Sequence, residues 1–208
     1  MTTMVLSCLI LVGCSDVETS QGTRTMINGD ADFIDKLPSD AVVCPDIDAA
    51  SEKLGAQVKL PADTLGEKEM VISYWRYGEI RSQPLEKRSG LVTIAVRDRF
   101  LLYAQRLNPG EVPNLPRDVK NFNESQKSVI EEGGNVPDVN EYMTTVAGFQ
   151  AKVSPLGYNN FPEGREPLPP RITWVDGNVY YSMDGVKQSV DSVTLDDLKK
   201  VVESMYPD

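Results

Sequence analysis

Histidine is absent from the 208-residue chain. Ser-His-Asp and Cys-His catalytic systems need an imidazole as general base, and the usual zinc sites need it as a ligand. Its absence therefore excludes a large share of hydrolases. We expect no catalytic set of these kinds, no bound metal and no cofactor.

Cysteine is scarce, with Cys8, Cys14 and Cys44 alone in the sequence. Cys8 and Cys14 fall in the first 14 residues, so Cys44 has no partner for a disulfide in the rest of the chain. Cys44 stands in an Ala-Val-Val-Cys-Pro segment, and we expect it to be a small buried apolar residue. The neighbouring acids Asp46 and Asp48 disfavour a reactive thiolate.

Positive charge is also in short supply. The chain has 21 Lys and Arg against 31 Asp and Glu, which gives a formal net charge of -10. This balance argues against nucleic acid as a partner and against electrostatic docking on anionic lipid. The composition, 40% hydrophobic and 25% charged, is that of an ordinary globular protein.

A short apolar run occupies residues 5–12, and a polar segment follows Cys14. A transmembrane helix needs about 20 apolar residues, more than twice this run. A buried core helix can be this short, but the residues that follow are too polar to pack against it. A secretory signal fits best, although residues 1–4 carry no Lys or Arg.

The segment Leu11-Val12-Gly13-Cys14 resembles the lipobox of bacterial lipoproteins. The resemblance implies cleavage before Cys14 and acylation of its thiol, with the protein held at the extracytoplasmic face of the bacterial cell membrane. We therefore expect a signal peptide over residues 1–13, a flexible tether over residues 14–32 and a single domain over residues 33–208.

Local patterns predict several elements of this domain. Asp46 or Asp48 can cap a short helix that ends at Gly55, and residues 58–61 read as a brief extended piece. Apolar and β-branched segments predict strands over residues 70–77, 91–96, 100–107, 141–146 and 149–153, and a weak helix signal covers residues 123–132.

The C-terminal segment has the clearest pattern. Asp176-Gly177 predicts a two-residue turn between strands over residues 171–175 and 178–183, which would pair Trp174 with Val179 and Ile172 with Tyr181. Thr194 predicts a helix start, and the helix that follows has one apolar stripe. We expect this stripe to cover Trp174, with Trp174 in the core. The sequence therefore predicts an α+β fold, a curved antiparallel sheet packed by a C-terminal amphipathic helix and one or two shorter helices.

This unit resembles an uncharacterised bacterial extracytoplasmic domain family, found in envelope lipoproteins and in the outer parts of anti-sigma-type membrane proteins. The matching residues are Thr145-Val146-Ala147-Gly148-Phe149, Ile172-Thr173-Trp174, Gly177, Val179-Tyr180 and residues 198–205, with a weaker match over residues 54–61. The sequence departs from the family over residues 63–66 and in a long insertion over residues 154–170. The resemblance implies an antiparallel sheet with helices and a sensory or binding role.

The insertion over residues 154–170 holds five prolines and two glycines. We predict a loop that keeps a defined shape without secondary structure and borders the surface that binds a ligand or partner, with Leu156, Tyr158 and Phe161 as its binding residues. An equally good interpretation is a passive cover over a sheet edge, since proline blocks strand addition.

Three functions compete. The favoured one is a non-catalytic, membrane-anchored envelope lipoprotein with a binding or sensory role towards a partner protein or a small apolar ligand. The alternative is a carboxylate-dependent hydrolase of cell-wall polymer, for which the available pairs are Asp46/Asp48, Glu131/Glu132 and Asp196/Asp197. A solute-binding component of an importer usually needs two domains around a cleft, and this chain is short for that.

Overall fold

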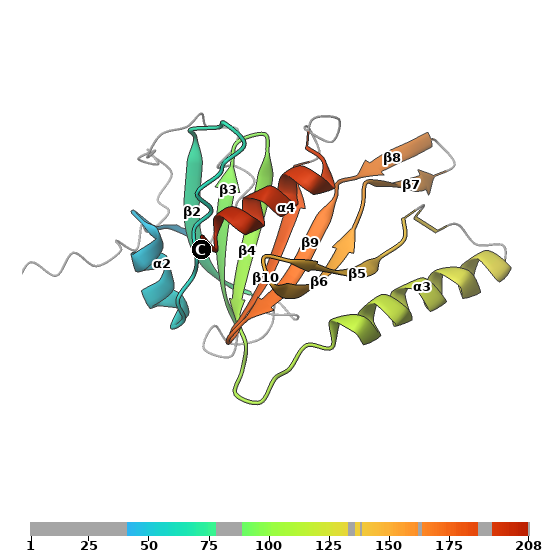
Figure 1. The fold of residues 1–208 in the computed structure, drawn as a ribbon, viewed down its shortest axis with the longest axis horizontal. Coiled ribbons are helices and arrows are strands. Elements are labelled where there is room, and N and C mark those ends of the chain that lie inside the picture. The colour runs from blue at the N-terminus through green and yellow to red at the C-terminus, as the bar shows by residue number, and fades with distance from the viewer. Residues whose placement is uncertain are drawn as a thin grey trace, which may run out of the picture.

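The computed structural model describes residues 41–77, 89–132, 136–137, 139–161, 164–186 and 193–207. Within these ranges the chain forms a curved, unclosed antiparallel sheet of eight strands, a separate two-stranded hairpin and three helices (Figure 1). The predicted α+β class and antiparallel sheet are confirmed. The signal peptide, Cys14 and the tether lie outside the described residues.

The strands of the large sheet follow a spatial order that differs from their order in the chain. From one edge to the other they are β1 (Val42–Val43), β2 (Met70–Tyr77), β3 (Ser89–Val96), β4 (Phe100–Arg106), β10 (Val179–Gly185), β9 (Arg171–Asp176), β6 (Phe149–Ser154) and β5 (Tyr142–Val146). The pairing of β4 with β10 joins the N-terminal strands to the C-terminal ones. The hairpin consists of β7 (Gly157–Phe161) and β8 (Gly164–Leu168), and the helices are α2 (Ile47–Leu54), α3 (Leu115–Glu131) and α4 (Leu195–Ser204).

Helix α2 has the boundaries that its sequence predicts. The Asp46 carboxylate accepts a hydrogen bond from the backbone N–H of Ala49 at 2.8 Å and so caps the first turn. Gly55 ends the helix in a left-handed conformation with φ 69°. Residues 58–61 belong to no strand; the Ser51 and Tyr181 side-chain oxygens accept hydrogen bonds from the backbone N–H groups of Val58 and Lys59 there.

Helix α4 begins with the predicted cap. The Thr194 hydroxyl accepts a hydrogen bond from the Asp197 backbone N–H at 3.1 Å, and the Asp197 carboxylate accepts one from the Thr194 N–H at 3.0 Å. Hydrogen bonds from Thr194 hold the pKa of the Asp197 carboxyl below its ordinary value. The helix lies over β9 and β10 (Figure 1), and its stripe of Leu198, Val201 and Val202 is fully buried.

Trp174 lies at the centre of this core, as predicted, with no exposed surface. Its ring stacks on Tyr181 at a centroid distance of 5.0 Å and an interplanar angle of 9°. Its indole N–H donates to the Tyr206 hydroxyl at 3.0 Å. Cys44 is buried in the same core, as expected.

The predicted turn between β9 and β10 is wrong by one residue. Gly177 and Asn178 form the turn, so Trp174 pairs with Tyr181 and Ile172 with Met183. Gly177 takes φ 58°, and a turn with glycine at its first central position suits a hairpin. Because each partner moves by two residues, the same side chains still share one face.

The start of α3 lies eight residues before the predicted one. Three prolines and a glycine over residues 108–116 favour a loop, but Pro116 occupies the first helical turn, where a missing N–H costs nothing. The Asn114 side chain accepts a hydrogen bond from the Arg117 backbone N–H at 3.0 Å and caps the helix.

The prediction of a loop without secondary structure over residues 154–170 is also wrong. This segment contains the β7–β8 hairpin, which forms a sheet of its own and extends beyond the edge of the large sheet (Figure 1). Pro167 stands opposite Tyr158 in β8. Since β8 pairs with β7 alone within the described residues, a residue without an N–H is tolerated there.

Candidate functional site

The two faces of the large sheet differ in chemistry. Successive side chains of a strand point to opposite faces, so Val92 and Ile94 enter the core beneath the helices while Leu91 and Thr93 point away from it. We call the second side the outer face. Its aromatic and polar members, matched through the strand register, include Ser73, Trp75, Thr93, Tyr103, Gln105, Tyr180, Ser182, Asp184, Arg171, Thr173 and Lys152, and its apolar members include Val71, Leu91, Ala95, Leu101 and Val175.

The outer face contains a hollow of about 290 Å³. Its lining is contributed by four neighbouring strands and consists of Trp75, Leu91, Tyr103, Gln105, Tyr180 and Ser182. The register explains why these residues meet: Trp75 pairs with Leu91, Leu91 with Gln105, and Gln105 with Tyr180. The hollow therefore lies over two adjacent rows of side chains that run across the strands, the second of which contains Tyr103 and Ser182.

The polar groups of the hollow are the Trp75 indole N–H, two phenols, the Gln105 amide and the Ser182 hydroxyl. The indole N–H of Trp75 donates to the Thr93 hydroxyl at 3.3 Å. Burial raises the pKa of the Tyr103 phenol, and the charge of Asp184 raises it further. Burial likewise raises the pKa of the Tyr180 phenol, opposed in part by a hydrogen bond with Thr173. Both phenols are therefore protonated at neutral pH and can donate hydrogen bonds to a ligand.

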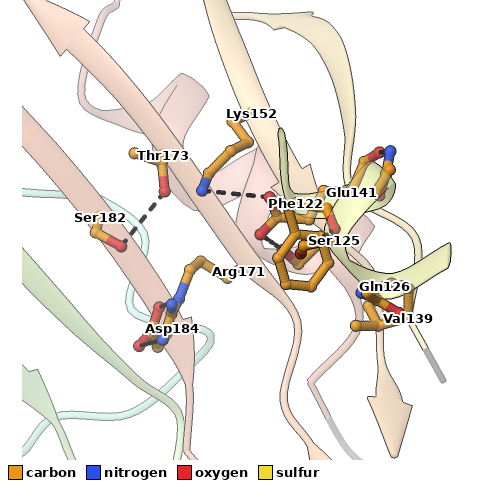
Figure 2. Close-up of polar contacts among 12 residues, drawn as sticks. Phe122, Ser125, Gln126, Val139, Glu141, Lys152, Arg171, Thr173, Ser182 and Asp184 are labelled. Atoms are coloured by element: carbon orange, nitrogen blue, oxygen red, sulfur yellow. Dashed lines mark hydrogen bonds and ion pairs between the residues drawn. The ribbon is translucent and has the colours of Figure 1, made fainter. Parts of the chain in front are cut away.

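Two ion pairs lie on the outer face (Figure 2), one between β9 and β10 and the other at β6. The Arg171 guanidinium donates through Nε and Nη2 to the two carboxylate oxygens of Asp184, at 2.6 and 2.8 Å. The Lys152 ammonium lies 3.4 Å from the Glu141 carboxylate, which also accepts a hydrogen bond from the Ser154 hydroxyl at 2.8 Å. Glu141 is only 8% exposed, so these contacts replace much of the water that would otherwise surround its carboxylate.

Helix α3 holds this end of the outer face in place. The Asn123 and Gln126 side-chain amides donate to the backbone carbonyls of Glu141 and Val139, at 2.9 and 3.1 Å. These two hydrogen bonds thus hold the segment that carries Glu141 against α3.

The binding residues predicted from the sequence do not line the hollow. Leu156 lies between β6 and β7 and is 40% exposed, and Tyr158 lies on β7, half-buried. Phe161 ends β7, and its side chain falls outside the described part of the chain. Tyr158 and Phe161 belong to the β7–β8 hairpin and Leu156 directly precedes it, and the binding role of all three stays a prediction.

The three carboxylate pairs proposed for a hydrolase lie apart from the hollow. Asp46 and Asp197 cap helices α2 and α4. Asp196 lies 2.9 Å from the Lys199 ammonium in an exposed pair. Glu131 and Glu132 are exposed at the end of α3, and Asp48 is exposed in the first turn of α2. In the described structure these acids have local roles at helix ends.

The residues of the hollow are absent from the set of site candidates that the sequence suggests. A signal for them exists, since Trp75, Leu91, Tyr103 and Tyr180 are large side chains at strand positions that alternate away from the core. The alternation of apolar and polar residues along a strand does not show which strands are neighbours. The hollow forms only because β4 lies beside β10 in the sheet.

Comparisons with known proteins add no family to this description: no family model, no curated protein and no solved structure matches the chain. In the part of the chain that the structure describes, no helix has both the length and the apolar character needed to cross a membrane. Within the same residues, no cluster of three or more Asp, Glu or Cys side chains is arranged to hold a metal ion.

Proposed function

We propose that the protein is a non-catalytic binding protein of the bacterial envelope, anchored by lipid at Cys14, whose outer-face hollow binds a small, largely apolar ligand. The observation that carries the proposal is the hollow itself, lined by Trp75, Leu91, Tyr103 and Tyr180 with Gln105 and Ser182 as polar members. Ligand sites are typically concave and mainly apolar, with a few polar groups that fix orientation.

The size of the hollow favours a small molecule over a protein partner. At about 290 Å³ it lies at the lower end of the range for ligand pockets and holds the volume of roughly ten water molecules. A stable protein interface buries about 800 Å² on each partner, far more than six side chains supply. The ligand therefore replaces water over aromatic surface, which is favourable by about 25 cal/mol per Å² buried.

Binding rather than hydrolysis is supported by the positions of the acids. A glycosidase needs two carboxyl groups about 5–9 Å apart on either side of the substrate. The pairs Asp46/Asp48, Glu131/Glu132 and Asp196/Asp197 lie at helix ends, away from the hollow. Of the acids whose charges act on the phenols of the hollow, Asp184 and Glu141 are paired with Arg171 and Lys152, and Asp118, in the first turn of α3, acts on Tyr180.

The envelope location rests on the lipobox-like Leu11-Val12-Gly13-Cys14. Two or more acyl chains on one residue give stable anchoring, since each buried methylene contributes about 0.8 kcal/mol. A lipid-anchored domain of this kind meets ligands in the aqueous space beside the membrane, in keeping with a site that opens on the surface of the sheet.

Binding can be tested with the neutral apolar dye Nile red and with the protein's own tryptophans. The chain has two, Trp75 in the hollow and Trp174 in the core on the other side of the sheet. Trp174→Phe leaves Trp75 as the single reporter, and Trp75→Phe leaves Trp174. Saturable dye binding should shift the emission maximum of the Trp174→Phe protein and leave that of the Trp75→Phe protein in place.

Variants of the lining then locate the site. Tyr103→Ala and Tyr180→Ala should each lower the affinity for the dye by about tenfold, which corresponds to about 1.4 kcal/mol of binding free energy. Tyr142→Ala is the matched control, because Tyr142 is a 42% exposed tyrosine on β5, outside the hollow. The proposal is wrong if Nile red does not bind, or if it binds all three variants equally.

A further inference from the structure

Arg171 lies at one end of the hollow. It pairs across the strands with Asp184, and Asp184 is two residues along β10 from Ser182, which lines the hollow. Residues two apart on a strand share a face, so the guanidinium and the hollow lie on the same side of the sheet. Figure 2 shows Arg171 and Asp184 together, with Ser182 next to them.

Asp184 orients the Arg171 guanidinium but accepts hydrogen bonds from only part of its N–H groups. It has five N–H groups, and the bidentate pair with Asp184 uses two of them, on Nε and Nη2. Its side chain is 51% exposed, whereas that of Asp184 is 17% exposed. A surface ion pair of this kind contributes little to stability, but its fork geometry fixes the plane of the guanidinium. The Nη1 edge is left for another acceptor.

The lining of the hollow adds hydrogen-bond donors to those of Arg171. The charge of Arg171 lowers the phenol pKa of both Tyr103 and Tyr180, against the larger effect of burial, so it acts on both hydroxyls. The two phenols are protonated donors, and Gln105 adds an amide N–H. Asp184 and Glu141 are paired with Arg171 and Lys152, while the charge of Asp118, in the first turn of α3, acts on Tyr180.

We infer that the ligand of the hollow is an amphipathic organic acid, whose carboxylate binds the free edge of the Arg171 guanidinium while its apolar body fills the space between Trp75, Leu91 and Tyr180. The inference rests on the proposed function and narrows its ligand class. The paired N–H groups of a guanidinium match the two oxygens of a carboxylate. A hydrogen bond between charged groups also contributes more to binding than a hydrogen bond between neutral groups.

The test compares acids with amides of the same shape, each used to displace Nile red from the full domain. The pairs are naphthoate with naphthamide and dodecanoate with dodecanamide. We expect the acid of at least one pair to bind about tenfold or more tightly than its amide at neutral pH. Arg171→Ala should remove this preference and leave the affinity of the amide unchanged.

Two controls separate the role of Arg171 from changes in net charge. Arg106→Ala removes the same charge from an exposed arginine on the opposite face of β4 and should keep the preference. Arg171→Ala leaves Asp184 unpaired, so repulsion by Asp184 alone would also weaken acids. The double variant Arg171→Ala/Asp184→Ala removes that repulsion and should still show no preference for the acid.

The outcomes separate the inference from the function on which it rests. Displacement by amides and acids alike overturns the acidic ligand and leaves the apolar site in place. A preference for acids that survives in the double variant also overturns the role of Arg171. Failure of Nile red to bind at all overturns the proposed function itself.

Discussion

Replacing Trp174 with alanine should remove a large part of the stability of the domain. The side chain has no exposed surface, and a buried tryptophan removes roughly 150–250 Å² from water. At about 25 cal/mol per Å² this amounts to about 4–6 kcal/mol. Relaxation around the cavity brings the expected loss to about 3–5 kcal/mol, a large fraction of the 5–15 kcal/mol that holds a typical domain folded.

Two variants separate the contributions of the individual Trp174 contacts to this loss of stability. Trp174→Ala removes the stacking on Tyr181, at 5.0 Å between centroids, and the hydrogen bond to the Tyr206 hydroxyl at 3.0 Å. Trp174→Phe keeps an aromatic ring in the stack and loses the N–H donor and part of the ring volume. We expect Trp174→Phe to cost about 1–2 kcal/mol, from one hydrogen bond and a partial cavity.

Urea unfolding followed by far-ultraviolet circular dichroism measures both variants without relying on tryptophan fluorescence. Thermal unfolding should show a fall of about 6–20 °C for Trp174→Ala, at roughly 2–4 °C per kcal/mol for a domain of this size. Trp75→Ala is the control, because Trp75 is half-buried on the outer face and should cost less than half as much. The reasoning is refuted if Trp174→Ala lies within 1 kcal/mol of the wild type, or costs no more than Trp75→Ala.

Three further predictions concern the anchor, a buried phenol and the hairpin. Cys14→Ser should move the protein from the membrane fraction to the soluble fraction on centrifugation, because the acyl chains are its expected anchor; sedimentation of the variant with membranes contradicts this. Burial raises the pKa of Tyr181 to about 12, so the stability it contributes is complete below pH 10 and is lost as the pH rises through 12; an alkaline unfolding series with Tyr181→Phe should show a shallower decline over this window. Replacing residues 156–161 with a Gly/Ser linker should leave Nile red binding and stability nearly unchanged if the hairpin is a partner surface, whereas a fall in the unfolding midpoint would make it a cover for the sheet.

Local chemistry explains why α2, α4 and most strands are predictable. A cap needs one side chain within three residues of a backbone N–H, as Asp46 and Thr194 have, so the signal lies in the sequence itself. The turn at Ala147 and Gly148 is similar, because both residues take positive φ, of 50° and 80°, which a tight hairpin requires. The same reasoning places Trp174 in the core, since period-two alternation puts it on one face with Tyr181 and Met183.

Proline accounts for two of the errors. In α3, Pro116 was weighed as a helix breaker, although the first turn has no use for the N–H that proline lacks. In β8, Pro167 was weighed as a strand breaker, although a strand with a single neighbour tolerates it. Both effects depend on the position of the proline within an element, and that position is unknown until the element itself is placed.

The hollow was missed for a different reason, which concerns distance along the chain. Tyr103 and Ser182 face one another across β4 and β10 although 79 positions separate them in the sequence. Alternation assigns each residue to a face of its own strand and is silent about which strand lies alongside. A site made from two residue rows across four strands therefore becomes visible only with the order of the sheet.

The two faces of this sheet separate stability from function. On one face the helices fill the space over Trp174, so a change there is felt as lost packing. On the other face Trp75, Tyr103 and Tyr180 surround a space that no described side chain fills, at the cost of apolar surface left in contact with water. A domain selected for stability alone would close such a hollow with a larger residue than Ser182 or Gln105. Its presence beside an oriented arginine is thus better explained by a ligand than by folding, and substitutions on the two faces should separate cleanly into those that unfold the protein and those that empty its site.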